Sequence, residues 1–311
     1  MSYLYENIRL CATIVSDTHI DVKHPVKIVP MYLLMSALKG AKKSRSDAFI
    51  TVGDTTSAGT AVNWELARTC FRKVPDAAGK IILTVGNHDG WNDDGGYEAA
   101  KSEYFSAYRD ICKREISTTY FSEKINGCYF ISIGTDSDSG CAAAIGDTQM
   151  EWFRAEMEKA GQTGKPIFVF CHQSLNGRHG LPRTWDRNEK PDRPFDEGGV
   201  GERSEEIAEI LKKYKNVFYF SGHSHMGLSG EDMLKTEGYS TFETEDGVTL
   251  INLPSLSCGN HHGEIQGLGI GLQLEIYDTK VVLRPKNYIS GKWIKKLSIK
   301  DGKPYYEKEL T

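Results

Sequence analysis

The sequence lacks the features of a membrane protein or of a strongly charged one. No run of apolar residues approaches the roughly 20 residues that a transmembrane helix requires. The formal net charge is only −4, so bulk charge indicates neither a nucleic-acid-binding surface nor a patch for a membrane surface. The N-terminal residues show no basic segment followed by an apolar one, and we therefore expect no secretory signal.

Cysteine is sparse and shows no pattern. The seven cysteines are odd in number and scattered, and no CxxC pair occurs. Free thiols in a reducing cytoplasm explain this usage better than a disulfide framework does. We therefore expect a cytoplasmic protein.

Internal repeats, low-complexity linkers and breaks in composition are also missing. The hydrophobic fraction of 39% and the charged fraction of 26% are those of an ordinary soluble globule, and 311 residues suffice for a sizeable core. We therefore predict a single domain over residues 1–311.

Apolar runs and helical patterns alternate over residues 8–90. Strands are predicted at 8–15, 48–52 and 81–85, and helices at 26–43 and 61–73. This repeat of strand, polar residues and helix indicates a mostly parallel sheet in an α/β fold.

Residues 95–311 continue with helices and a larger share of strands. Helices are predicted at 95–113, 147–159 (with Asp147 as N-cap) and 204–213, and strands at 119–124, 128–133, 166–171, 217–220 and 248–253. Asn126-Gly127 indicates a hairpin between the first two of these strands. A second hairpin is predicted from 271–277 and 280–284. The last stretch, about 40 residues, is expected to provide edge strands or a tail because its lysines suit an exposed edge.

Polar side chains follow directly after five of the predicted strands. They are Asp17 and His19; Asp54; Asn87, His88 and Asp89; His172; and His223 with His225. The carboxyl ends of strands are where open α/β folds place their sites. Residues two apart in an extended segment point to the same side, so Asp17 with His19, or His223 with His225, would reach one ion.

Each group by itself also has a structural interpretation. Asp17 suits a helix N-cap, and a single histidine after an apolar strand, such as His172, is commonly a hydrogen-bonded core residue. Together, however, the groups hold seven ligands, whereas one Zn²⁺ needs four. Seven ligands with a bridging carboxylate suit two ions about 3.5–4 Å apart, and mixed oxygen and imidazole donors fit Mn, Fe or Zn.

Two further segments have two interpretations each. Residues 173–201 are too long and irregular for an ordinary connection, and their arginines, Arg178 among them, either clamp an anionic substrate or belong to a solvated loop. Asp136 and Asp138 follow a predicted strand and belong either to a pocket or to a solvated loop.

The order of these blocks resembles the calcineurin-like metallophosphoesterase superfamily. The matching blocks are D-x-H at 17–19, G-D at 53–54, G-N-H-D at 86–89, the histidine at 172 and G-H-x-H at 222–225, so the resemblance spans residues 9–225. It implies a four-layer α-β-β-α sandwich with mixed sheets and with metals at the carboxyl ends of the strands. It also implies hydrolysis of phosphate esters by a metal-activated hydroxide, with no cofactor beyond two divalent or trivalent ions.

The resemblance further implies a role for each residue. The first ion would take Asp17, His19, Asp54 and His225, and the second would take Asp54, Asn87, His172 and His223, with Asp54 bridging the two. His88 would not bind metal. It would donate to the phosphate or to the leaving-group oxygen, held in place by Asp89.

The substrate is left open by these motifs. Asp89, where protein Ser/Thr phosphatases of the superfamily carry Glu, argues against that branch, and no matching tyrosine ligand or secretory signal points to purple acid phosphatases. A small phosphomonoester, a cyclic nucleotide or another phosphodiester fits, with no membrane or nucleic-acid partner indicated. Candidates for substrate contact are Asn92, Arg178, His179, Asn260, His261 and His262. The rival hypothesis is a binding scaffold without catalysis; the complete ligand set and His88 favour the enzyme.

Overall fold

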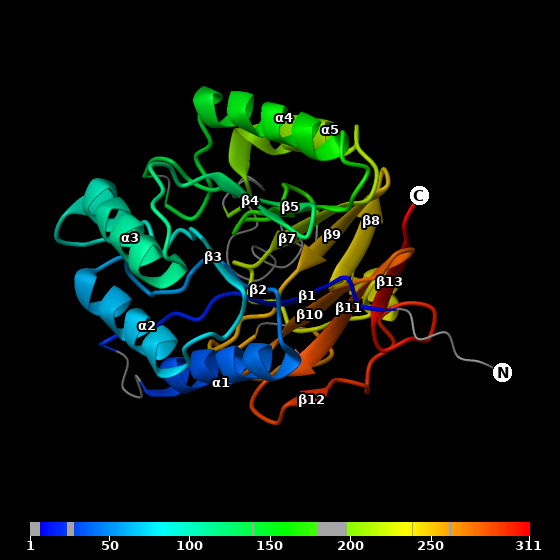
Figure 1. Cartoon of the computed structure of the whole chain (residues 1–311), viewed down its shortest axis with the longest axis horizontal. Helices are drawn as coiled ribbons and strands as arrows, with labels where there is room; N and C mark the ends of the chain where they lie inside the picture. The colour runs from blue at the N-terminus through cyan, green and yellow to red at the C-terminus, as the bar shows by residue number, and fades with distance from the viewer. Residues whose placement is uncertain (1–6, 24–27, 139, 179–197, 238, 261–262) are drawn as a thin grey trace.

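Two β-sheets packed face to face form the centre of the molecule, and helices cover their outer faces (Figure 1). This computed structural model describes residues 7–23, 28–138, 140–178, 198–237, 239–260 and 263–311. Among these residues, no helix combines the length and the apolar character needed to cross a membrane.

The first sheet has the strand order β12-β11-β10-β1-β2-β3, and β13 pairs with β11. Its strands are β1 (Leu10–Val15), β2 (Ala48–Val52), β3 (Lys80–Thr84), β10 (Ile270–Ile276), β11 (Lys280–Asn287), β12 (Lys292–Trp293) and β13 (Tyr306–Glu309). Strands β1, β2 and β3 are parallel, whereas β10 runs antiparallel to β1. The carboxyl ends of β1 to β3 therefore lie at one edge of the sheet.

The second sheet has the order β4-β5-β6-β7-β9-β8. Its strands are β4 (Phe121–Ile125), β5 (Cys128–Ser132), β6 (Ile167–Phe170), β7 (Val217–Ser221), β8 (Phe242–Glu245) and β9 (Val248–Asn252). The four central strands are parallel, and β4 and β8 are antiparallel edge strands. The predicted hairpin between β4 and β5 is confirmed, with positive φ at both Asn126 and Gly127.

Helices α1 (Ile28–Ser44), α2 (Ala61–Lys73) and α3 (Gly96–Cys112) lie outside the first sheet, and α4 (Asp147–Gly161) and α5 (Ser204–Leu211) outside the second (Figure 1). A short 3-10 helix (Gly201–Arg203) precedes α5, and α6 (Glu231–Glu237) follows β7. The predicted α/β class and four-layer α-β-β-α sandwich are thus confirmed.

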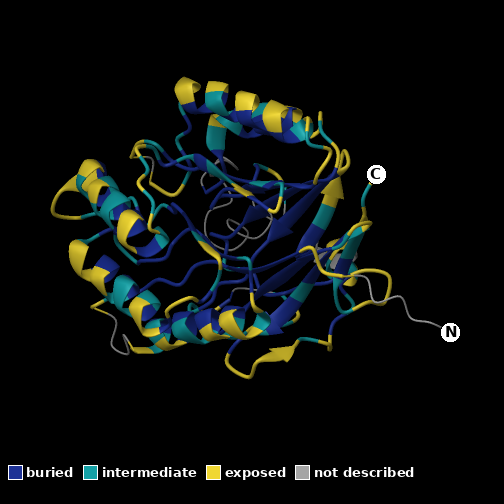
Figure 2. Ribbon diagram, viewed as in Figure 1, coloured by how far each residue is buried: buried dark blue, intermediate teal, exposed yellow. Residues whose placement is uncertain are grey.

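Alternation along the second sheet divides the core into two parts. Phe168, Phe170 and Phe220 point into the space between the sheets, whereas Val169 and Tyr219 pack under α4 and α5. The central strands β6, β7 and β9 are accordingly buried on both faces, while the helices expose one face (Figure 2).

Two expectations about the elements are wrong, and two elements were missed. Strand β10 lies between β1 and β11 and is buried along its whole length, so the last segment of the chain is not confined to edge strands or a tail. Gly146, not Asp147, is the N-cap of α4. Helix α6 and strand β8 were not predicted, because neither has a long periodic pattern.

Candidate metal centre

The loops that follow β1, β2, β3, β6 and β7 meet between the two sheets. The backbone N–H of Asp17 donates to the carbonyl oxygen of Gly53 at 3.2 Å, which joins the loops after β1 and β2. From the second sheet, the backbone N–H of His223 donates to the two carboxylate oxygens of Asp17 at 3.1 and 3.2 Å. These contacts bring Asp17 and His223, from opposite sheets, next to each other.

A first cluster holds two imidazoles and two carboxylates. The Nε2 atoms of His19 and His225 are 3.1 Å apart. Oδ1 of Asp17 lies 3.1 Å from Nε2 of His225 and 3.7 Å from Nε2 of His19, and Oδ2 of Asp54 lies 3.6 Å from Nε2 of His19. Ligands of one ion at bonds of about 2.0–2.2 Å have such mutual spacings, so this cluster fits a transition metal.

A second cluster contains Asp54, His172 and His223, whose ligand atoms lie within 4.8 Å of one another. The Nδ1–H of His172 donates to the carbonyl oxygen of Val52 at 2.7 Å, so Nε2 is the ring nitrogen that faces the cluster. Oδ1 of Asn87 is buried and has no hydrogen-bond partner among the described residues. A buried carbonyl oxygen left without a donor is costly, and a cation beside it would satisfy it.

Asp54 lies between the two clusters. Its Oδ2 is 3.6 Å from Nε2 of His19 and 3.0 Å from Nε2 of His172, while its Oδ1 accepts the backbone N–H of His88 at 2.9 Å. The hydrogen bond to Oδ1 therefore orients the carboxylate. Oδ2 faces the ring nitrogen of His19 in the first cluster and that of His172 in the second.

The electrostatics of the clusters also favour bound cations. Asp17 and Asp54 are fully buried. Burial raises the pKa of Asp17, but the imidazoles of His172 and His225 outweigh it and hold that pKa well below its usual range. Burial lowers the pKa of His172, yet the carboxylates of Asp54 and Asp17 raise it to about 10. The two buried carboxylates thus favour positive charge beside them. Bound metal ions would supply this charge.

The backbone at the ligands is not extended, contrary to expectation. Five of the seven predicted ligands have positive φ: Asp17 at 54°, His19 at 48°, Asp54 at 48°, His223 at 67° and His225 at 48°. Residues other than glycine rarely adopt this left-handed conformation, which costs on the order of 1–3 kcal/mol each. The paired ligands therefore converge through sharp turns rather than through strand alternation.

Two glycines permit the close packing of these turns. A Cβ on Gly86 would lie 2.1 Å from Oδ1 and 2.3 Å from the backbone nitrogen of Asp54. A Cβ on Gly222 would lie 2.0 Å from the hydroxyl of Ser16 and 2.4 Å from the carboxylate of Asp17. Any side chain at either position would displace a predicted ligand.

The predicted contact between His88 and Asp89 is wrong. Nδ1 of His88 lies 2.9 Å from the carbonyl oxygen of Ser57, which orients the ring. The carboxylate of Asp89 is buried and instead accepts the N–H and hydroxyl of Thr56, both at 2.9 Å, and the N–H of Gly86 at 3.1 Å. Asp89 therefore fixes the loop that carries Asn87 and His88.

Cys258 was not predicted to be near the metals. Its sulfur and the ring nitrogens of His19 and His225 lie within 4.8 Å of one another. The hydroxyl of Ser255 accepts the Cys258 N–H at 2.9 Å and donates to the carbonyl oxygen of Asp17 at 2.9 Å, so the turn is fixed against a ligand loop. A cysteine without a CxxC partner gave no sequence signal for this position.

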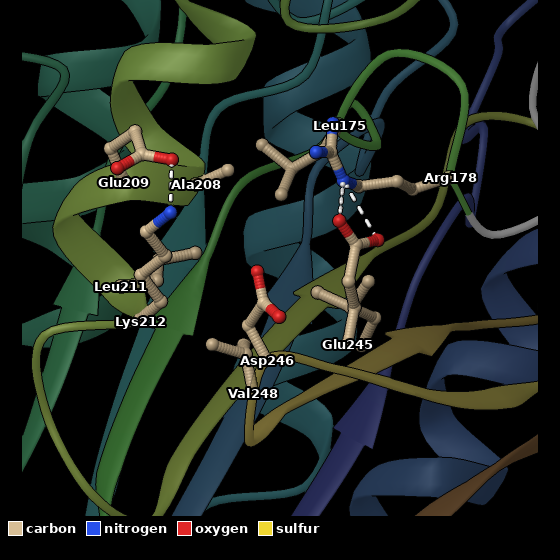
Figure 3. Close-up of a pocket in the computed structure, with 10 residues that line it drawn as sticks. Leu175, Arg178, Ala208, Glu209, Leu211, Lys212, Glu245, Asp246 and Val248 are labelled. Carbon is tan, nitrogen blue, oxygen red and sulfur yellow. Dashed lines mark hydrogen bonds and ion pairs between the residues drawn. The ribbon is translucent and has the colours of Figure 1, made fainter.

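Arg178 forms ion pairs with two carboxylates that belong to neither metal-ligand cluster. Its guanidinium lies 2.8 Å from Glu205 at the start of α5 and 2.9 Å from Glu245 at the end of β8. Figure 3 shows the pair with Glu245 beside a hollow of about 30 Å³. Asp246 in the turn before β9 also lines this hollow, which places it toward the amino end of that strand. The substrate clamp expected of Arg178 is not supported.

Two of the other candidates for substrate contact, Asn92 and Asn260, lie among the described residues. Asn260 is buried, accepts the Ser255 N–H at 2.8 Å and donates to Gly267 at 2.8 Å, so it stabilises its own loop. Asn92 accepts the N–H of Asp94 at 3.0 Å in the turn before α3. His179, His261 and His262 lie outside the described residues.

A pocket of about 350 Å³ opens beside His88, and most of its lining was not predicted. Its residues are Asn87, His88, Gly90, Trp91, Tyr97, Thr135, Ser137, Asp138, Gly140 and Cys141. We call it the Trp91 pocket.

The two acids that follow β5 have different positions. Asp138 lines the Trp91 pocket, whereas Asp136 accepts hydrogen bonds from Gly146 and Gln149 at 3.1 Å at the start of α4.

Buried carboxylates and imidazoles at the ends of parallel strands, in a sandwich of two sheets, form a candidate metal site. A family model, the calcineurin-like phosphoesterases, matches residues 12–227, and this chain belongs to that family. The predicted superfamily is therefore confirmed, and the chain is a metal-dependent phosphoesterase. No curated protein sequence matches the chain.

Solved structures with the same fold include two phosphatases. A dimetal phosphatase from Danio rerio has a TM-score of 0.58 and 11% identity, with 91% of this chain and 97% of that chain covered. The purple acid phosphatase PPD1 from yellow lupin has a TM-score of 0.62 and 13% identity, with 92% of this chain but 52% of that chain covered. At these identities the similarity concerns the fold.

Proposed function

We propose that this phosphoesterase uses two transition-metal ions, Mn, Fe or Zn, to hydrolyse a phosphomonoester or phosphodiester of a small molecule. The observation that carries the proposal is the position of Asp54. Its Oδ2 lies between His19 of the first cluster and His172 of the second. One carboxylate oxygen between two groups of nitrogen donors is the arrangement of a bridging ligand in a two-metal site.

The residues fall into two ligand groups in this proposal. The first ion would be held by Asp17, His19, Asp54 and His225, and the second by Asp54, Asn87, His172 and His223. The sulfur of Cys258 is placed to add to the first group. When bound, the ions would neutralise phosphate oxygens and lower the pKa of a bound water toward about 7.

His88 is proposed to donate a proton to the leaving-group oxygen. Its ring centroid lies 4.9 Å from that of His19, so it borders the first cluster. With Nδ1 held by the carbonyl of Ser57, Nε2 is the atom free to carry the transferred proton. His88 also lines the Trp91 pocket, where a leaving group would lie.

A substrate screen with a metal analysis tests the proposal. Protein purified without chelator should contain close to two transition-metal ions per chain, measured by elemental analysis. With Mn²⁺ present, it should hydrolyse at least one of a panel of mono-, di- and cyclic phosphate esters. Protein that neither contains nor takes up metal, and that Mn²⁺ does not activate, would exclude the two-metal model.

The alternative is a metal-binding scaffold for protein partners on the same fold. A scaffold needs no proton donor, whereas His88 is oriented toward the pocket by its bond to Ser57. Metal content without turnover on any ester of the panel would favour the scaffold. The cytoplasmic location and the single domain stay predictions.

A further inference from the structure

The Trp91 pocket borders the predicted proton donor and the second cluster. Asn87 and His88, which follow β3, form one side of it, and Trp91 continues the same loop. A phosphate held at the metal centre would therefore direct its leaving group into this pocket.

The pocket has an aromatic wall held on a fixed backbone. The backbone N–H of Trp91 donates to the carbonyl oxygen of His88 at 3.2 Å, and the Trp91 carbonyl accepts the N–H of Gly59 at 2.7 Å. The Trp91 residue is nevertheless 54% exposed, and its ring centroid lies 5.8 Å from that of His88. A large aromatic residue that is fixed at its backbone and half exposed beside a pocket is suited to stacking with another ring.

The floor of the pocket is rigid as well. Tyr97, near the start of α3, is buried, and its hydroxyl donates to the carbonyl oxygen of Thr135 at 3.0 Å. This bond joins the first turn of α3 to the loop after β5. The volume of about 350 Å³ is at the lower end of that of small-molecule sites and suits a group of the size of a nucleoside.

The charge of the lining favours an uncharged occupant. Among the described residues that line the pocket, none is lysine or arginine, and Asp138 carries a carboxylate. Within the described lining, a leaving group with a phosphate of its own would meet this carboxylate and no lysine or arginine to offset it.

We propose that the Trp91 pocket binds the alcohol part of the phosphate ester and selects one that carries an uncharged planar ring, as a nucleoside does. This inference rests on the proposed function, because it assigns the leaving group of the same reaction. Trp91 would stack on the ring, and the hydroxyl and carboxylate of Ser137 and Asp138 would accept hydrogen bonds from its polar edge.

Kinetics on paired esters test the inference. The substrates are adenosine 5′-monophosphate and its methyl ester, compared with glycerol 3-phosphate and its methyl ester. Trp91→Ala should lower kcat/KM for the adenosine esters about tenfold more than for the glycerol esters, mainly through KM, because base stacking contributes about 1–3 kcal/mol. Trp91→Phe should recover most of this loss.

Trp293→Ala, which removes an exposed tryptophan from β12, is the matched control. It should leave kcat/KM unchanged for both kinds of ester. An equal loss on both kinds of ester would overturn the inference.

Adenosine without phosphate separates this inference from the proposed function. Titration calorimetry with metal-loaded protein should show one adenosine site per chain, weakened by Trp91→Ala at least about fivefold. Adenosine binding without turnover of any ester would support a nucleoside site in the pocket and contradict the proposed hydrolysis. Turnover without adenosine binding and without preference for a ring would support the hydrolysis and contradict the nucleoside site.

A second phosphate tests the charge argument. Adenosine 3′,5′-bisphosphate should have a lower kcat/KM than adenosine 5′-monophosphate, and Asp138→Asn should narrow the difference. Equal kcat/KM values for the two nucleotides in the unmodified protein would overturn the inference that the pocket selects an uncharged group.

Discussion

The Nδ1–H of His172 donates to the carbonyl oxygen of Val52 at 2.7 Å, and this bond joins the two sheets at the candidate metal centre. Val52 is the last residue of β2 in the first sheet, whereas His172 follows β6 in the second. The bond fixes the tautomer of His172, so that Nε2 faces Asp54 at 3.0 Å. The same contact therefore links the two sheets and orients a predicted ligand.

The metal-free protein is expected to lose stability as pH rises. In the absence of metal, the carboxylates of Asp54 and Asp17 raise the pKa of His172 to about 10, although burial opposes them, from a usual value of 6.5. A group whose pKa is raised on folding contributes stability that is complete below pH 6.5 and is lost as pH rises toward about 10. Thermal unfolding of chelator-treated protein should show a falling Tm over this window.

The His172→Asn variant is the control for the pH dependence. It should flatten the decline of Tm between pH 6.5 and 10, because the titrating imidazole is gone. A decline of the same size in the variant would show that another group is responsible.

His88→Ala should retain the metals and lose most turnover. His88 borders the first cluster but is held by Ser57, so its removal leaves the seven predicted ligands in place. Loss of a general acid costs about 10²- to 10⁴-fold in rate. Steady-state kinetics on p-nitrophenyl and bis-p-nitrophenyl phosphate, with elemental analysis of the same preparations, measure both effects. Unchanged turnover would remove His88 from the mechanism.

Gly86→Ala should destabilise the protein and lower its metal content. The added Cβ would lie 2.3 Å from the backbone nitrogen of Asp54, so the loop after β2 must move. Overpacking of this kind costs about 1–3 kcal/mol in the free energy of unfolding. Denaturant unfolding and elemental analysis should detect the two changes.

Gly259→Ala is the matched control for Gly86. A Cβ on Gly259 meets no atom within 4 Å, and this glycine has no positive φ. The control should match the unmodified protein in stability and metal content. The same metal loss in both variants would mean that the contact with Asp54 is not the cause.

Cys258 is expected to add a thiolate to the first ion. Its sulfur and the ring nitrogens of His19 and His225 lie within 4.8 Å of one another, and a metal deprotonates a coordinating thiol. Protein loaded with Co²⁺ should therefore show a sulfur-to-metal charge-transfer band in the near ultraviolet. Cys258→Ser should remove the band, whereas Cys141→Ser, at an exposed thiol, should leave it. An identical spectrum in Cys258→Ser would exclude the sulfur ligand.

Most of the order of the elements, and the polar residues at the strand ends, could be predicted from the amino-acid sequence. Buried strands such as β2 and β6 are apolar throughout, so their ends are marked by the first polar residues, Asp54 and His172. Because parallel strands bring their carboxyl ends to one edge, such local patterns sufficed for the α/β class and for the seven candidate ligands, whereas the four-layer sandwich was implied by the resemblance to a known family.

How those side chains meet and what surrounds them could be learned from the folded structure alone. The left-handed turns at Asp17 and His225, the bond from His88 to Ser57 rather than to Asp89, and the position of Cys258 all depend on contacts between distant segments. Strand β10 likewise carries no local sign of its place beside β1. Hydrophobic periodicity reports the burial of a residue but not its partner, and the partners here come from the opposite sheet or from loops of another strand.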